Sequence, residues 1–174
     1  MSFLFKNLTN ETRRYMKDEV ERDLKNNTLY ISDRLSPAGK SAYPNLLLKS
    51  IENGNEATLA NSLLGEFNPT YLRRNPDGEF IAVKLPSNQH QVLAEGEFNR
   101  YYIRALCRIS LLSGAQLRIY RAKISGNPRL ESEYKIGKLI SAEQLLSDLR
   151  TNQGTDTALG LPSGPNSGLS VELI

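Results

Sequence analysis

The sequence predicts an α+β fold in which helices pack on a small mixed sheet and an extended arm ends the chain. Two observations predict it. Segments with apolar residues three and four positions apart, the spacing of one helix face, are separated by short segments rich in β-branched and aromatic residues. Residues 151–174 instead contain four glycines and two prolines, and only Asp156 and Glu172 among them are charged. We therefore expect a single α+β domain over residues 1–150, followed by an arm over residues 151–174.

The first third of the chain is expected to be mainly helical. Residues 9–25 predict a helix that Thr9 caps with its hydroxyl group. Ser36 followed by Pro37 is a typical helix start. Because proline lacks the amide hydrogen, Pro44 is expected to interrupt this helix, so that a separate helix covers residues 44–53. Shorter helices are expected over residues 56–64 and, near the end of the domain, over residues 142–150.

Three strands are expected in the small sheet, at residues 28–32, 79–85 and 116–123. The second follows Asn-Pro-Asp-Gly at 75–78, which is a strong turn sequence. Its apolar residues alternate onto both faces, so both faces are expected to be at least partly covered. Residues 170–174 could add as an edge strand, either to the sheet of this chain or to that of a neighbour.

A long helix is expected over residues 87–112. Asn88 and Gln91 resemble a capping box at its start, and Gly114 is a typical stop. Gly96 lies inside this helix and costs about 1 kcal/mol relative to alanine. A glycine retained at that cost suggests close packing against another backbone, or a kink.

The most informative feature of this helix is a row of arginines. Arg100, Arg104 and Arg108 are spaced four residues apart, which places three guanidinium groups in one stripe, with Glu97 one turn before them. Such a stripe needs anions opposite it. The residues leave three sources open: carboxylates of the same chain in an internal ion-pair network, a partner chain, or nucleic-acid phosphate.

Basic residues are unevenly distributed. Residues 97–138 contain nine basic and three acidic side chains, a net charge of +6, whereas the whole chain carries +3, so the remainder carries −3. Tyr101, Tyr102 and Tyr120 could stack on bases beside these cations. The region is therefore a candidate polyanion surface, and its candidate nucleic-acid or partner contacts are Arg100, Arg104, Arg108, Arg118, Arg121 and Lys123.

No catalytic or cofactor motif rises above chance, and we expect neither a cofactor nor a metal. His90 and Cys107 are the sole histidine and cysteine and lie on one predicted helix, roughly 25 Å apart at 1.5 Å per residue, so they cannot act together. Asp77, Glu79 and Lys84 have the residue types of a metal nuclease, but the turn already explains Asp77.

Composition also bears on location. Cys107 lies among apolar residues and predicts a buried thiol, and a lone cysteine allows no disulfide within the chain, which fits a reducing compartment. The N-terminus lacks the apolar stretch of a signal peptide, and no segment approaches the ~18 apolar residues of a membrane span. We expect no membrane partner and a cytoplasmic location, or a virion location if a phage encodes the protein.

Three segments resemble a family of uncharacterised bacterial proteins that are often prophage-associated. They are residues 29–36 (Leu-Tyr-Ile-Ser-Asp-Arg-Leu-Ser), residues 93–108 around Glu-Gly-Glu-Phe-Asn-Arg-Tyr-Tyr, and residues 158–170 around Gly-Leu-Pro-Ser-Gly-Pro-Asn-Ser-Gly. The resemblance spans nearly the whole chain and implies a virion component or an accessory phage protein. It carries over no catalytic residue.

Two hypotheses of function follow. The first is a non-enzymatic structural or assembly protein of the phage type, such as a capsid or head component, which forms a homo-oligomer or larger assembly through its long helix and C-terminal arm. Gly96, Glu97 and Cys107 then have structural roles. The alternative is a nucleic-acid-binding protein or metal-dependent nuclease that uses the basic region 97–138.

Overall fold

The computed structural model describes residues 3–124, 126, 130–154, 159–161 and 167–174. It confirms the α+β class: the described residues form six helices, of which the long one is central, and five strands. The elements, in chain order, are α1 (Asn10–Lys25), α2 (Pro37–Asn53), α3 (Glu56–Ser62), β1 (Thr70–Arg74), β2 (Phe80–Lys84), α4 (Gln89–Ser113), β3 (Leu117–Arg121), α5 (Leu130–Glu133), β4 (Leu139–Ile140), α6 (Ala142–Thr151) and β5 (Leu169–Leu173).

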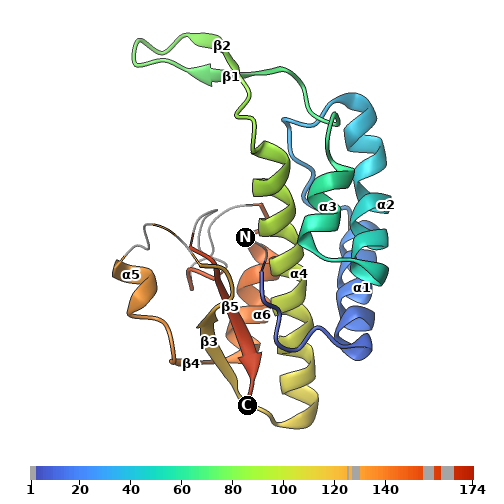
Figure 1. The fold of residues 1–174 in the computed structure, drawn as a ribbon, viewed down its shortest axis with the longest axis vertical. Helices are drawn as coiled ribbons and strands as arrows, with labels where there is room; N and C mark the ends of the chain where they lie inside the picture. The colour runs from blue at the N-terminus through green and yellow to red at the C-terminus, as the bar shows by residue number, and fades with distance from the viewer. Residues whose placement is uncertain (1–2, 125, 127–129, 155–158, 162–166) are drawn as a thin grey trace.

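The long helix α4 is the centre of the fold (Figure 1). It contacts α1 and α3 on one side, and α6 and the β3–β5 sheet on the other. Its apolar side chains Phe98, Tyr102 and Leu106 are fully buried, because neighbours surround the helix over most of its length. Burial of this much apolar surface is the main source of stability in a domain of this size.

The second helix differs from the prediction, because α2 runs unbroken through Pro44. Tyr43, Leu47 and Ile51 are four residues apart, lie on both sides of the proline and are fully buried. An interior proline costs about 3 kcal/mol, and burying three large side chains, at about 1.5–3 kcal/mol each, outweighs that cost. The predicted start is confirmed, since Ser36 Oγ accepts a hydrogen bond from the Gly39 amide.

The sequence made specific predictions for both ends of α4 and for the glycine inside it. Gly114 ends the helix in the left-handed conformation at φ 77°, as predicted. The predicted capping box is wrong, since Asn88 makes no side-chain cap and its backbone, at φ −96° and ψ 14°, is not extended. The expected close packing of Gly96 against another backbone is also wrong: a β-carbon there would meet no atom within 4 Å, so no neighbour requires glycine. The alternative expectation, a kink, stays a prediction.

Residues 28–32 do not form the predicted strand. Their side chains make the contacts instead: Leu29 and Tyr30 pack against the core, and a β-carbon on Gly154 would lie 2.1 Å from the Tyr30 ring. The only backbone bridge nearby joins Leu35 to Phe67. A β-rich composition therefore reflects side-chain packing here, since no described strand pairs with the segment.

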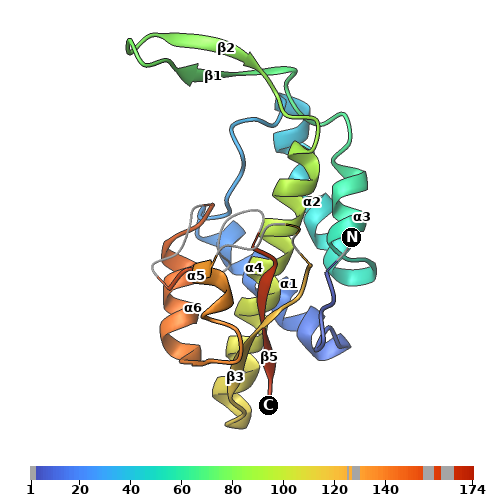
Figure 2. The same cartoon turned by 60° about the vertical axis from the view of Figure 1, so that its left-hand side comes forward.

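The strand at 79–85 is confirmed as β2, but its surroundings differ from the prediction. Among the strands that the structure describes, it pairs with β1 alone, a strand that sequence reasoning missed. The predicted turn at 75–78 joins the two strands. Figures 1 and 2 show this hairpin standing away from the rest of the molecule. The face with Leu72 and Phe80 is exposed, so the expectation that both faces are at least partly covered is wrong for it. On the other face Tyr71 and Val83 are partly covered, and the Arg34 guanidinium lies 4.4 Å from the centre of the Tyr71 ring.

The second sheet has the order β4-β3-β5 and is antiparallel throughout, rather than mixed. The predicted strand at 116–123 is β3, and the predicted edge strand at 170–174 is β5, which pairs with β3 of the same chain from Leu117↔Leu173 to Arg121↔Leu169. Two parts of the predicted arm, residues 155–158 and 162–166, lie outside the described residues.

Candidate functional site

Arg104, the middle residue of the arginine stripe, lies in the core and not on a surface. Its side chain is 0% exposed. Its guanidinium donates to both oxygens of Asp23, at 2.5 and 2.9 Å, and to Glu19 Oε2 from Nη2 and Nε, at 2.6 and 2.9 Å. An external phosphate cannot reach this side chain, so the predicted nucleic-acid contact of Arg104 is wrong.

The network extends to a third helix. Arg150 of α6 donates to both oxygens of Glu19, at 2.5 and 3.0 Å, and the Tyr101 hydroxyl donates to Asp23 Oδ2 at 2.8 Å. Burial disfavours the ionised carboxylates, but bonds and charges from Arg104 and Arg150 outweigh it and lower the pKa of Glu19. The bond and charge of Arg104 likewise lower the pKa of Asp23 despite its burial. The cluster joins α1, α4 and α6.

Sequence reasoning missed the acidic half of this network, although a signal exists. Glu19 and Asp23 are four residues apart in the first helix, and they alternate with Met16 and Val20 on its buried face. Acids within an apolar stripe require buried cations. Arginines at the same four-residue spacing in the long helix supply these cations. The structure thus confirms the interpretation of the stripe as part of an internal ion-pair network.

The other two arginines of the stripe also find partners in this chain. Arg100 is buried, pairs with Glu97 at 3.3 Å and donates to the Asn152 carbonyl at 2.8 Å. Its burial makes the predicted nucleic-acid contact wrong for Arg100 as well. Arg108 is partly exposed and lies 3.2 Å from Asp18 Oδ2 and 3.5 Å from Glu19 Oε1.

The three basic residues around β3 are likewise paired. Arg118 lies 2.9 Å from Glu172 of β5, Arg121 pairs with Glu133, and Lys123 pairs with Glu95. The structure thus brings the six candidate contacts against acids or carbonyls from distant parts of the chain. The excess positive charge of region 97–138 is largely compensated within the fold, and nucleic-acid binding by it stays a prediction.

Two predicted structural residues lie deep in the core. Burial raises the pKa of Glu97. Within the described part of the chain, neither Glu97 Oε2 nor the hydroxyl of the nearby Tyr43 has a hydrogen-bond partner. Cys107 is fully buried, and burial raises the pKa of its thiol, so the predicted buried cysteine is confirmed and is not a nucleophile. His90 and Cys107 lie on the one unbroken helix α4, too far apart to act together.

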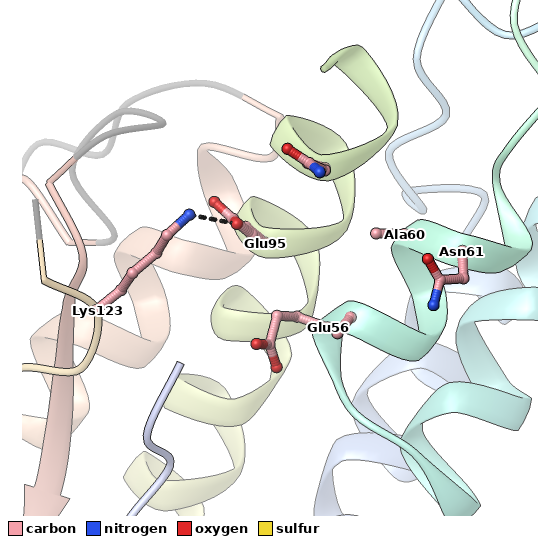
Figure 3. A pocket seen from close by; sticks show the side chains of 7 residues that line it. Glu56, Ala60, Asn61, Glu95 and Lys123 are labelled. Atoms are coloured by element: carbon pink, nitrogen blue, oxygen red, sulfur yellow. Dashed lines mark hydrogen bonds and ion pairs between the residues drawn. The ribbon is translucent and has the colours of Figure 1, made fainter. Parts of the chain in front are cut away.

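A cavity of about 340 Å³ lies between α3, α4 and the segment after β3. Figure 3 shows Lys123 reaching toward Glu95 of α4, with Glu56 of α3 beside them. The Phe3 amide donates to Glu56 Oε1 at 2.7 Å, while Glu56 Oε2 is buried with no hydrogen-bond partner among the residues described. Burial raises the pKa of Glu56; the Glu95 charge adds to this rise, and Lys123 opposes it. The lining residues are Glu56, Ala57, Ala60, Asn61, Gln91, Glu95 and Lys123.

The buried Glu56 carboxyl makes the free energy of unfolding depend on pH. Because its folded pKa is raised, its protonated form adds stability below the ordinary glutamate pKa of about 4.3, and this contribution is lost as pH rises through the folded pKa. Glu56→Gln stays neutral and keeps an acceptor for the Phe3 amide. We expect the variant to gain stability over wild type as pH rises from 4 to 8, measured by urea unfolding. A flat difference for Glu56→Gln would contradict the prediction.

The cavity combines two carboxyl groups and an ammonium group and can hold a small polar group. Among the described residues, no group of three or more histidine, cysteine, aspartate or glutamate side chains is placed to hold a metal ion. Asp77 and Glu79 of the suggested nuclease set lie in and next to the exposed hairpin turn. None of the helices in the part of the chain that the structure describes is both long and apolar enough to span a membrane.

The most unusual surface is the β1–β2 hairpin. Cross-strand pairing places Leu72, Ala82 and Phe80 on one face, and Tyr71, Val83 and Ile81 on the other. Leu72 is 69% exposed and Phe80 is 71% exposed. Arg73, Arg74 and Lys84 of the same strands form no ion pair with any described residue. The hairpin is therefore apolar on both faces and carries uncompensated positive charge.

Comparisons with known proteins found no match. No family model matches this sequence, and neither a curated protein nor a solved structure is significantly similar to it. The family suggested by the three segments therefore stays a prediction.

Proposed function

We propose that this chain is a non-enzymatic structural or assembly protein that self-associates, and that the β1–β2 hairpin makes the contact. The exposure of apolar side chains on both hairpin faces supports this proposal. An isolated two-stranded hairpin is marginally stable in water, and cross-strand apolar pairs stabilise it best when a further surface covers them. A projecting, two-sided apolar hairpin is typical of a segment that docks on another chain.

The hairpin replaces the surfaces first expected to mediate association. Most of the long helix α4 is buried against neighbours of its own chain, and β5 is paired with β3 and largely buried. Apart from the exposed Leu111 and Leu112 at the end of α4, neither has much apolar surface left for a second chain. The phage-type part of the proposal, a capsid or head component, is supported only by the resemblance of the three segments.

A second candidate, nucleic-acid binding, is favoured by one observation. The unpaired Arg73, Arg74 and Lys84 lie on a two-stranded ribbon, and the major groove of DNA admits such a ribbon. Asp77 and Glu79 in the same hairpin reduce its net charge to +1, and its exposed side chains are mainly apolar. The composition therefore favours a protein surface, and nucleic acid is an outcome that the experiment must detect.

The test is the molar mass of the purified protein by light scattering, over a range of concentrations. We expect wild type to exceed its 19.5 kDa chain mass and Leu72→Ser/Phe80→Ser to remain near it, with an unchanged melting temperature. Leu64→Ser, at an exposed leucine outside the hairpin, is the matched control and should assemble like wild type. A wild type that stays monomeric at every concentration would overturn the proposal. If that monomer instead binds duplex DNA with strong salt dependence, and loses binding on Arg73→Ser/Arg74→Ser, the second candidate holds.

A further inference from the structure

The cavity between α3, α4 and the segment after β3 has the size and charge of a small-ligand site. Its volume of about 340 Å³ lies within the range of about 300–1,000 Å³ that such sites have. Helix α3 contributes Glu56 and Asn61 to its wall, and α4 contributes Gln91 and Glu95. Lys123 follows β3 and reaches toward Glu95 (Figure 3). With two carboxylates and one ammonium group, the wall carries a net charge of −1 when Glu56 is ionised, so it complements a cation.

The wall also has hydrogen-bond acceptors without donors. Glu56 is only 2% exposed, and its Oε2 has no hydrogen-bond partner among the described residues. Glu95 accepts from Lys123 with Oε1, and its second oxygen accepts from no residue that the structure describes. The side-chain amides of Asn61 and Gln91 likewise make no hydrogen bond within the described part of the chain. Together these oxygens can bind a ligand that donates several hydrogen bonds.

The Glu56 carboxyl is the strongest sign of a ligand. A buried carboxylate oxygen without a donor is costly, and burial accordingly raises the pKa of Glu56. Rotation about the Cγ–Cδ bond, a soft torsion in glutamate, turns Oε2 toward the cavity that this side chain lines. A cation that donates to Oε2 removes the cost of the missing donor. Its binding therefore gains from a group that the fold alone leaves unsatisfied.

We infer that this cavity binds a small organic cation through a primary ammonium group, which donates to Glu56 and Glu95. One such nitrogen has three N–H donors, enough for both carboxylates and one amide oxygen. The methyl groups of Ala57 and Ala60 line the same cavity and can contact a short alkyl chain.

A divalent metal ion fits this cavity less well. The Lys123 ammonium group, paired with Glu95, repels it, and among the described residues no group of three or more histidine, cysteine, aspartate or glutamate side chains is placed to hold it. The inference is independent of the proposed self-association, because the cavity lies beside α3 and the hairpin stands away from it (Figure 1).

A titration with n-butylammonium chloride, followed by NMR, tests the inference. The side-chain amide groups of Asn61 and Gln91 lie in the cavity wall, so their resonances report binding directly. We expect both resonances to shift and to reach saturation. Tetramethylammonium chloride is the matched control ligand, since it has the same charge but no N–H donor, and it should leave both in place. Affinity should fall as pH is lowered from 8 to 5, because a proton then competes with the ligand for Glu56, which Glu95 and Lys123 face.

Two variants change the site in different ways. Glu56→Gln keeps the side-chain size and an acceptor for the Phe3 amide but loses the charge, and it should bind n-butylammonium about tenfold more weakly or worse. Ala57→Leu keeps every charge but fills part of the cavity from an exposed position, and it should also weaken binding at an unchanged melting temperature. Glu143→Gln, at an exposed glutamate of α6 on the other side of α4, is the matched control and should bind like wild type.

Three results would overturn the inference. They are the absence of a saturable shift with n-butylammonium, an equal response to tetramethylammonium, and unchanged affinity in Glu56→Gln. A saturable shift with calcium chloride at lower concentrations than with n-butylammonium would also overturn it, since the cavity would then be a metal site. The hairpin variant Leu72→Ser/Phe80→Ser should bind the ammonium ion like wild type, so failure of the self-association proposal leaves this result unaffected.

Discussion

Replacing Arg104 by methionine is expected to lower the free energy of unfolding by about 3–5 kcal/mol. Methionine fills much of the arginine volume but removes the bidentate partner of Asp23, which keeps only the single contact to Arg22 at 3.2 Å among its ion pairs with described residues. It leaves Glu19 with Arg150 and with Arg108 at 3.5 Å. A buried carboxylate that loses its cation keeps its full desolvation cost. Since domains are stable by about 5–15 kcal/mol in total, this is a large share.

Thermal and urea unfolding measure this effect, and Lys17→Met provides the matched control. The Lys17–Glu52 pair is half exposed, so its loss should cost less than about 1 kcal/mol.

Because the pKa values of Glu19 and Asp23 are lowered in the fold, their ionised forms contribute stability above pH ~4, which is lost as pH falls through the folded pKa. The difference between wild type and Arg104→Met should therefore be full at pH 7 and narrow below pH ~4. A loss under about 1 kcal/mol at pH 7 would show that the network is not what joins the three helices.

Substituting alanine for Gly168 is expected to cost about 2–4 kcal/mol, from backbone strain and overpacking together. Gly168 has φ +62°, and a β-carbon there would lie 2.1 Å from the Lys123 carbonyl oxygen. Its own carbonyl accepts the amides of Ala122 and Lys123, at 2.7 and 3.1 Å. The residue thus holds the start of β5 against the end of β3, where only glycine fits.

The same substitution at Gly96 is the matched comparison and should have the opposite sign. Gly96 lies within α4 with open space around it, so alanine should raise the free energy of unfolding by about 0.5–1 kcal/mol. Urea unfolding of both variants measures the contrast. Equal effects at the two glycines would contradict the assigned packing of β5.

Local signals predicted local structure well. The Ser36 start, the Gly114 stop, the turn at 75–78 and most of the helices follow from a few adjacent residues, and the structure confirms them. Apart from the Asn88 capping box, the predictions that failed depend on what surrounds a segment. Pro44 stays helical because buried side chains on both of its sides outweigh the proline cost, which no local rule can weigh.

In the candidate site, too, the sequence predicted the local spacing of the residues but not the contacts that depend on packing. The spacing of Arg100, Arg104 and Arg108 predicts a stripe of guanidinium groups, and that stripe is present. Which anions face it depends on packing α1 and α6 against α4, which brings Glu19 within 2.6 Å of Arg104 across a long sequence separation. No signal in residues 70–85 indicates that the face with Leu72 and Phe80 stays uncovered.

Periodicity, caps and turns act between residues close in the chain, and they were enough to predict the α+β class, most helix ends, the arginine row and the buried thiol. Contacts between distant segments show that the arginines neutralise the protein's own acids, that β5 completes the sheet of its own chain, and that the hairpin stands free. Those outcomes depend on which distant surfaces meet, and burial and charge pairing across the fold select them.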